Sequence, residues 1–262
     1  MISLYTKLIG ASLRSRMQYK VNFIFSSFSY ALISGIDFLL LAAILYRFDD
    51  VKGWTLYEVG ILYGIASAGI ALYRLLAPEI HNFERYIIQG EFDSLLIRPV
   101  SPLLLLLSRN LDLGKIGGVA QGLLVIGISL VGLGKADRVT PMLLLYIPVA
   151  IIGGLCISFS LGLITATIAF WTQRIKDFQT FTLYAPFNAA NYPMSIYPGW
   201  LKFIFFTVVP VAFVNYVPVV YLLGKDGSWI NLFLAPVVAL FILFVSYSFW
   251  KIGIRSYHST GS

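Results

Sequence analysis

Long apolar runs, separated by short polar breaks, are the feature that most constrains how this chain of 262 residues can fold. A helix needs about 20 mostly apolar residues to cross the hydrocarbon core of a bilayer. Hydrophobic residues make up 58% of the chain and charged residues 12%, about half the charged fraction of a soluble domain. The sequence therefore predicts an all-α polytopic membrane protein. Its composition argues against a soluble enzyme, a disordered regulator and a disulfide-rich secreted module. Six membrane spans are predicted, over residues 21–46, 57–80, 115–133, 141–171, 178–197 and 229–250.

One further apolar stretch, residues 199–223, is not predicted to cross the membrane as a single helix. Pro210 and Pro218 divide it into pieces of about ten residues or fewer, which reach only about 15 Å as helix. We expect a re-entrant helical hairpin, because irregular backbone is tolerated at membrane depth where protein or a water-filled cavity covers it. Residues 1–20 are too polar to span, and an interfacial helix is expected there. No linker divides the chain, so residues 1–262 are expected to form a single domain.

The basic residues indicate the orientation in the membrane. With both ends, the segment after the second span and the break at residues 173–176 on one side, 13 of the 19 Lys and Arg residues lie on that side. The positive-inside rule makes this side cytoplasmic. The net charge of +7 is thereby explained by topology, and no nucleic-acid partner is expected. The first 20 residues lack a small-residue cleavage site, so a removable signal peptide is not expected.

The sequence carries no recognisable catalytic or cofactor motif. The nearest match to a phosphate-binding loop, residues 129–136, has Ser129 in place of the first glycine and Ala136 in place of the Ser or Thr that holds magnesium. Cys156 is the only cysteine and the chain has two histidines, too few for a thiolate or histidine-rich metal site. We expect a chain that is not itself an enzyme and that has no metal or other cofactor of its own.

The polar segment between the second and third spans, residues 81–102, is the most informative. It places apolar side chains on an otherwise charged run, with Gly90 able to end one helix and Pro99 the next. Such a segment suits either an interfacial loop resting on lipid headgroups or a short helix that docks into a partner's groove. The pattern alone leaves both open.

Two stretches resemble a known family. The run Gly90-x-Phe-Asp93-x-Leu-Leu-x-Arg98-Pro99 resembles the cytoplasmic segment that follows the second span of ABC-2 type exporter permeases. The proline-rich stretch 192–224 is similar to the branch of that superfamily that includes viologen- and daunorubicin-type exporter permeases. Together with the six predicted spans and the broken hairpin, the resemblance covers essentially the whole chain.

The resemblance implies a permease subunit of an ATP-driven exporter of hydrophobic or amphipathic compounds, multi-pass in a bacterial plasma (inner) membrane. Two permease chains, identical or related, would sit on two copies of a cytoplasmic ABC ATPase, which binds ATP and Mg. In this picture, residues 81–102 receive the ATPase stroke, and the hairpin 199–223 forms an extracellular gate. The residues implied in coupling are Gly90, Phe92, Asp93, Leu95, Leu96, Arg98 and Pro99. The residues implied in the gate are Pro198, Trp200, Pro210, Asn215, Tyr216 and Pro218.

Asp37 is the one acid well inside a predicted span, about 15 Å in from Arg47. A carboxylate inside a membrane usually indicates a functional role. The alternative is a structural role, in which the Asp37 carboxyl is neutral or hydrogen-bonded to Gln121 or Asn188. Arg74 is expected to snorkel toward the cytoplasm rather than to pair with Asp37. The candidate pathway residues are Asp37, Gln121, Asn188 and Asn191.

Two other functions remain open from the sequence. An ion-coupled secondary transporter would use Asp37 as its proton or cation site, although the internal repeats usual for that class are not seen. A non-transporting membrane scaffold would need only the apolar spans. Small residues at every fourth position of the spans, such as Gly154 and Gly162, predict close helix packing within one chain or between chains.

Overall fold

The computed structural model describes residues 10, 20–47, 50 and 52–257. In this part of the chain the secondary structure is helical, without strands. Five helices are long and apolar enough to cross a membrane: α2 (Lys20–Arg47), α3 (Leu56–Leu76), α8 (Ile116–Gly134) with the preceding turn η1 (Leu113–Lys115), α9 (Pro141–Thr172) and α14 (Ile230–Arg255). The prediction of an all-α polytopic membrane protein is therefore confirmed. The interfacial helix expected over residues 1–20 lies, except for residues 10 and 20, outside the described residues.

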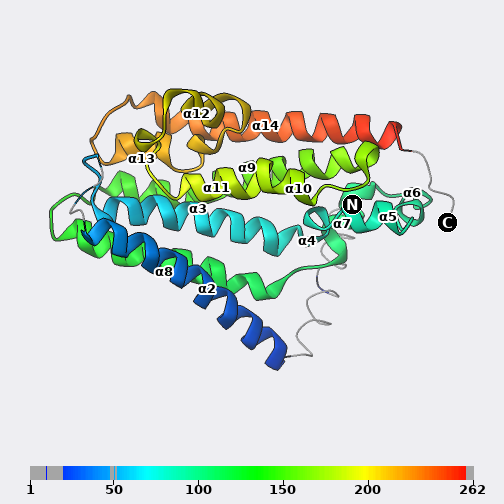
Figure 1. The fold of residues 1–262 in the computed structure, drawn as a ribbon, viewed down its shortest axis with the longest axis horizontal. Helices are drawn as coiled ribbons and strands as arrows, with labels where there is room; N and C mark the ends of the chain where they lie inside the picture. The colour runs from blue at the N-terminus through cyan, green and yellow to red at the C-terminus, as the bar shows by residue number, and fades with distance from the viewer. Residues whose placement is uncertain (1–9, 11–19, 48–49, 51, 258–262) are drawn as a thin grey trace.

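The helices run along the long axis of the molecule, and the two ends differ in character (Figure 1). One end carries four short helices, α4 (Pro78–His81), α5 (Glu84–Ile88), α6 (Asp93–Leu96) and α7 (Pro102–Arg109), and it also holds the last turn of α14. The opposite end carries α12 (Gly199–Phe203) and α13 (Tyr216–Leu222). We call these the α4–α7 end and the hairpin end.

The fifth predicted span, residues 178–197, is not a single long helix. Three consecutive pieces, α10 (Lys176–Gln179), the π-helical turn η2 (Thr180–Tyr184) and α11 (Ala185–Ala190), lead from the α4–α7 end toward the hairpin end (Figure 1). Pro186 has no N–H to donate and its ring clashes with the carbonyl four residues earlier, which accounts for the widened turn just before it. The 3₁₀ turn η3 (Met194–Ile196) follows Pro193.

The segment 199–223 folds as a broken helix pair; Pro210 divides it as expected, but Pro218 does not, because it lies in the first turn of α13. Residues Gly199–Val208, formed by α12 and the π-helical turn η4 (Ile204–Val208), are bent by 76° from Val211–Leu222, formed by η5 (Val211–Phe213) and α13. The bend falls at Pro210, whose missing N–H interrupts the helix. Both halves lie at the hairpin end (Figure 1).

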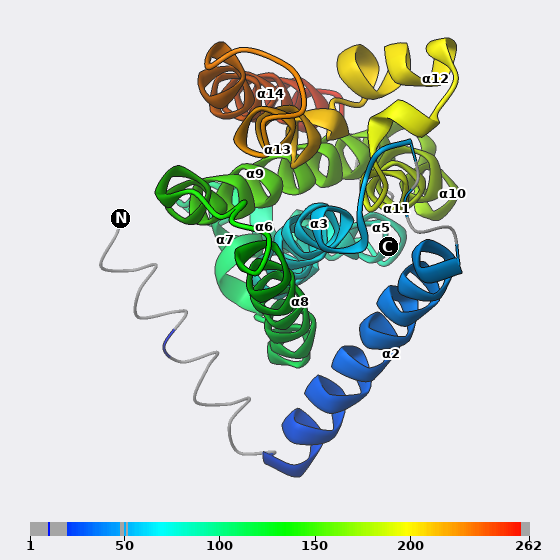
Figure 2. The same ribbon diagram turned by 90° about the vertical axis from the view of Figure 1, so that its left-hand side faces the viewer.

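Helix α3 is the centre of the bundle, with α8, α9 and α11 around it (Figure 2). Glycines allow this packing: a Cβ on Gly122 of α8 would lie 2.9 Å from the Gly64 oxygen of α3, and one on Gly69 would lie 3.1 Å from the Gly154 Cα of α9. These small residues therefore pack helices of one chain against each other. Helix α2, by contrast, lies at the outside and is mostly exposed (Figure 2).

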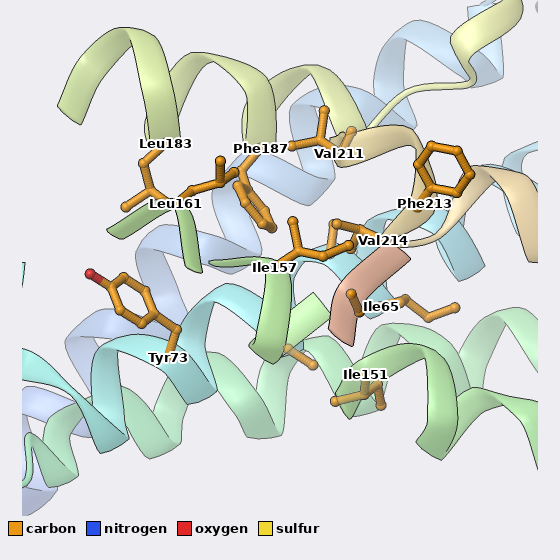
Figure 3. Close-up of a cluster of buried hydrophobic side chains, with 14 of the residues drawn as sticks. Ile65, Tyr73, Ile151, Ile157, Leu161, Leu183, Phe187, Val211, Phe213 and Val214 are labelled. Carbon is orange, nitrogen blue, oxygen red and sulfur yellow. The ribbon is translucent and has the colours of Figure 1, made fainter. Parts of the chain in front are cut away.

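The buried core between α3, α9, α11 and the hairpin consists of aliphatic and aromatic side chains (Figure 3). Ile65 of α3, Ile157 of α9 and Val214 after η5 meet there, and each is 1% exposed or less. The hairpin is thus fixed to the bundle by apolar contacts as well as by the polar contacts described below.

Candidate functional site

The short helices at the α4–α7 end fold onto the ends of two long helices through an aromatic cluster. The ring of Phe92 lies 5.4 Å from that of Phe83, 5.2 Å from Phe170 of α9 and 6.2 Å from Trp250 of α14. It also lies 5.0 Å from the ring of Tyr257, just beyond α14. Edge-to-face pairs of this kind contribute about 0.5–1.5 kcal/mol each beyond the area they bury. The segment is therefore attached to α9 and α14.

Polar contacts attach the same segment to the start of α10. The Glu84 carboxylate accepts hydrogen bonds from the backbone N–H groups of Ile175, at 2.7 Å, and Lys176, at 3.2 Å. The Gln179 side chain donates to the carbonyl oxygen of His81 at 2.6 Å. A carboxylate at the first turn of a helix is favourable because the N–H groups there lack intrahelical partners. The segment is therefore attached to α10 as well as to α9 and α14.

The residues that the resemblance implies in coupling divide into a buried and an exposed set. Phe92 and Leu95 are 0% and 3% exposed, so they pack inward and offer little surface to a docking partner; their part in coupling stays a prediction. Phe92 is buried because Phe170 of α9 and Trp250 of α14 offer it an aromatic surface. Leu96 and Ile97, 40% and 85% exposed, face outward together with Arg98 and Pro99.

Two further coupling residues have a local structural role. Gly90 has φ of +67°, a conformation that favours glycine, and it ends α5. Asp93 is partly buried beside Tyr257, and burial, followed by the hydrogen bond with Asp93 and then its charge, raises the pKa of Tyr257 to about 12.

At the hairpin end, a buried carboxylate joins three segments. Glu58 is 0% exposed, and its two oxygens lie 2.7 Å from the Arg138 guanidinium and 3.0 Å from the Lys225 ammonium. One oxygen also accepts from the Thr55 N–H at 2.7 Å. We call these contacts the Glu58 clamp. It connects the start of α3 to the α8–α9 connection and to the end of the hairpin, and Lys225 also bonds to the Gly53 carbonyl and lies over the Trp54 ring.

The expected gate residues are placed unequally in the hairpin. Pro198 and Trp200 are exposed, whereas Pro210 and Pro218 are buried. Tyr216 is half-buried, with its ring 5.7 Å from that of Trp54.

Asn215 is 0% exposed and binds the hairpin to the bundle. Its side-chain N–H groups donate to the carbonyl oxygens of Leu62, at 2.8 Å, and Ala190, at 2.7 Å. This side chain therefore holds the second half of the hairpin, at the start of α13, against α3 and α11.

Three of the four candidate pathway residues meet at one cavity. Asp37, Asn188 and Asn191 line a cavity of about 210 Å³ between α2, α3 and α11. The fourth, Gln121, lies behind it and accepts a hydrogen bond at 3.3 Å from Ser67, which lines the cavity. Among the described residues Asp37 has no hydrogen bond to Gln121 or Asn188. The alternative in which Asp37 is hydrogen-bonded to one of these amides for a structural role is therefore not observed.

Arg74 lines the same cavity and, as expected, forms no ion pair with Asp37 among the described residues. Its guanidinium donates to the hydroxyl of Tyr30 at 2.8 Å and to that of Tyr184. The Tyr184 hydroxyl lies 2.8 Å from His81 Nε2, at the start of the α4–α7 segment. Burial, followed by the charges of Arg74 and Lys115, lowers the pKa of His81 to about 4, so His81 is neutral at pH 7.

Sequence reasoning missed the Glu58 clamp, the Arg74 contacts and the aromatic cluster. Thr55-x-x-Glu58 has the spacing of a helix capping box, and that signal could have directed attention to Glu58. Arg74 is an ionisable residue inside a span, which is also a general indicator of function.

Together, the five long apolar helices and the bent helix pair define an all-α polytopic membrane protein. A family model described as ABC-2 family transporter protein matches residues 31–261. The match covers most of the chain, and the chain belongs to this family. A search of curated proteins gives no match.

Proposed function

We propose that this chain is the permease subunit of an ATP-driven exporter, and that a separate cytoplasmic ABC ATPase supplies the energy. The family membership supports the permease class. The observation that carries the proposal is the α4–α7 segment: it is fixed to α9, α10 and α14 on one side and presents Leu96 and Ile97 on the other.

A segment that transmits force needs two properties, and both are present here. Its inner face must be attached to the transmembrane helices, which the aromatic cluster and Glu84 achieve. Its outer face must offer apolar surface that a partner can bury, since burying a Leu or Ile side chain contributes about 1.5–3 kcal/mol. Ile97, at 85% exposed, is the side chain with most to bury.

The assembly in this proposal contains two permease chains, identical or related, and two ATPase copies that bind ATP and Mg. The α4–α7 end faces the cytoplasm, as do both termini, and the membrane is the bacterial plasma membrane. Exposed apolar side chains on α2 and α14 are available to lipid and to the second permease chain.

Alternating access assigns opposite tasks to the two ends. ATPase closure would push the α4–α7 segment, and the hairpin would open as the extracellular gate. Opening then requires the Glu58 clamp to break, because it links the hairpin end to the start of α3. The transported compounds would be hydrophobic or amphipathic.

A secondary transporter is the second candidate, because Asp37 lies in a polar intramembrane cavity. It would transport without any ATPase. The third candidate, a membrane scaffold, would bind a partner without ATPase activity.

Purification of the chain from its host, with identification of what is retained, tests the proposal. We expect a stoichiometric ATPase, and Ile97→Asp should reduce its retention because it places a charge in the contact. Ala136→Asp is the matched control, since it adds an acid at an exposed position of the hairpin end. Substrate movement that continues with a hydrolysis-deficient ATPase would contradict the proposal and favour ion coupling, and a partner without ATPase activity would favour the scaffold.

A further inference from the structure

The cavity between α2, α3 and α11 carries two opposite charges that are not paired with each other. Asp37 contributes a carboxylate from α2, and Arg74 contributes a guanidinium from α3. Both line the same space of about 210 Å³, yet no ion pair joins them among the described residues.

The Asp37 carboxylate lacks a neutralising partner among the described residues. It is exposed in the cavity and has no hydrogen bond or ion pair to a described side chain. An ionised carboxylate inside a membrane is costly unless it is paired or solvated. A ligand that brings a cationic group to Asp37 would remove that cost.

The Arg74 guanidinium is oriented but not neutralised. Its partners are the hydroxyls of Tyr30 and Tyr184, which are uncharged acceptors, and its Nε is buried without a hydrogen-bond partner. Guanidinium groups bind carboxylate and phosphate groups through paired N–H donors. The two tyrosines thus hold a positive charge at the cavity wall, where an anionic group can meet it.

The two charges are held at different levels along α2. Arg74 bonds to Tyr30, which precedes Asp37 by seven residues of α2, a rise of about 10 Å. The positive charge therefore lies toward the α4–α7 end and the negative charge toward the middle of the span. This separation suits a ligand whose own charges are several bonds apart.

The size and lining of the cavity restrict the ligand further. Drug-sized pockets have volumes of about 300–1,000 Å³, so a cavity of about 210 Å³ holds a headgroup rather than a whole amphiphile. The rings of Tyr63 and Phe187 and the amides of Asn188 and Asn191 complete the walls. Aromatic faces favour an ammonium group, and amides donate and accept hydrogen bonds.

We propose that this cavity binds the headgroup of a zwitterionic amphiphile, with its amine or quaternary ammonium at Asp37 and its phosphate or carboxylate at Arg74. A ligand with only a positive charge would be attracted by Asp37 but repelled by Arg74. A ligand with only a negative charge would be attracted by Arg74 but repelled by Asp37. Only a ligand with both charges neutralises both walls. The inference rests on the proposed function in that this ligand would be the transported compound.

Binding to the purified chain in nanodiscs of phosphatidylglycerol tests the assignment. Three probes share a dodecyl chain: dodecylphosphocholine is zwitterionic, dodecyltrimethylammonium is cationic and dodecyl phosphate is anionic. Equilibrium dialysis measures each dissociation constant, with empty nanodiscs to subtract partition into lipid. Because a charge-assisted contact is lost with each singly charged probe, we expect the zwitterion to bind at least about tenfold more tightly than either.

Two variants assign the charges to the two residues. Asp37→Asn should weaken binding of the zwitterion about tenfold and spare binding of the anion, and Arg74→Gln should improve binding of the cation. Asp177→Asn and Lys135→Gln remove exposed charges away from the cavity and should change nothing. If Arg74→Gln does not fold, Asp37→Asn decides alone, because the Asp37 side chain makes no described hydrogen bond.

The source of the headgroup is distinguished by competition. Displacement of the probe when phosphatidylethanolamine is added to the nanodisc would identify a bilayer lipid, and displacement by free phosphocholine would identify a compound from water. Equal binding of the cation and the zwitterion to the unmodified chain, or binding indifferent to Asp37→Asn, would overturn the proposal. The assay contains no ATPase, so a failure here leaves the proposed exporter function intact, and binding without ATP-driven transport would refute only the latter.

Discussion

Replacing Glu58 by Gln should loosen the hairpin end strongly, because it removes a buried charge without changing the volume of the side chain. Glu58 is 0% exposed and lies 2.7 Å from Arg138 and 3.0 Å from Lys225. Removing one member of a buried ion pair costs about 3–5 kcal/mol, since the partners lose their counter-charge. The Arg138 side chain is 51% exposed, so water can solvate its charge once it is unpaired. We therefore expect a loss at the lower end of this range, about 3 kcal/mol.

Unfolding in mixed micelles by titration with sodium dodecyl sulfate measures this loss. The matched control is Glu91→Gln, which breaks the 3.3 Å ion pair with Arg109, whose side chains are 36% and 45% exposed. An exposed pair contributes at most about 1 kcal/mol, so the control should unfold almost as the original chain does. Hydrogen exchange should also rise in residues 134–140 and 223–229 of the Glu58→Gln chain, because the clamp joins these two connections.

Two outcomes would refute this reasoning. The first is an equal effect, within about 0.5 kcal/mol, of Glu58→Gln and Glu91→Gln on the free energy of unfolding. The second is a loss of stability without faster exchange at the hairpin end, which would show that Glu58 supports the bundle in general.

Three further predictions concern the α4–α7 end and the topology. The pKa of His81 is lowered from 6.5 to about 4, so between these pH values the unfolded chain binds one proton more than the folded chain does. The contribution of His81 to stability should therefore fall as the pH drops from 6.5 to 4 and stay constant above 6.5. Thermal unfolding at a series of pH values measures this dependence, which should be lost in His81→Gln. Phe92→Ala should lower the free energy of unfolding by about 3–5 kcal/mol because Phe92 is buried. Ile97→Asp should leave that free energy nearly unchanged and weaken ATPase binding, because Ile97 is exposed. A large loss of stability in Ile97→Asp and none in Phe92→Ala would contradict this prediction. Cysteines placed at Ser94 and Ser228 in a cysteine-free chain should react with an impermeant thiol reagent from opposite sides of the membrane, and labelling from one side would refute the six-span topology.

Much of the fold was predictable because lipid imposes simple rules on sequence. The five long helices follow from runs of about 20 apolar residues, and the broken hairpin follows from Pro210 within an apolar stretch. The fifth span was predicted less well. Pro186 and Pro193 interrupt it, and an apolar run does not show how tertiary packing divides a helix into short pieces.

The candidate sites were predictable in part. Asp37, Asn188 and Asn191 were singled out as polar residues within apolar spans, and they line one cavity. The direction of side chains was not predictable where a segment folds onto helix ends. Phe92 and Leu95 are apolar like Leu96 and Ile97, yet only the first two are buried, and Phe92 is buried against Phe170 and Trp250, which are distant in the sequence.

The Glu58 clamp depends on contacts between residues 80 and 167 positions apart along the chain, which no local pattern records. Thr55 and Glu58 predict a capped helix start, and the same carboxylate also binds two distant cations. The same reasoning applies to Arg74, whose partners come from α2 and from η2.

ATP-driven transport by the reconstituted complex tests the central claim most directly. The chain and its co-purified ATPase are placed in proteoliposomes, and movement of an amphipathic substrate is followed with ATP, without ATP, and with Ile97→Asp in the permease. We expect movement that requires hydrolysable ATP and that falls in Ile97→Asp while the bundle stays folded. Movement driven by an ion gradient in the absence of ATP, unaffected by Ile97→Asp, would contradict it.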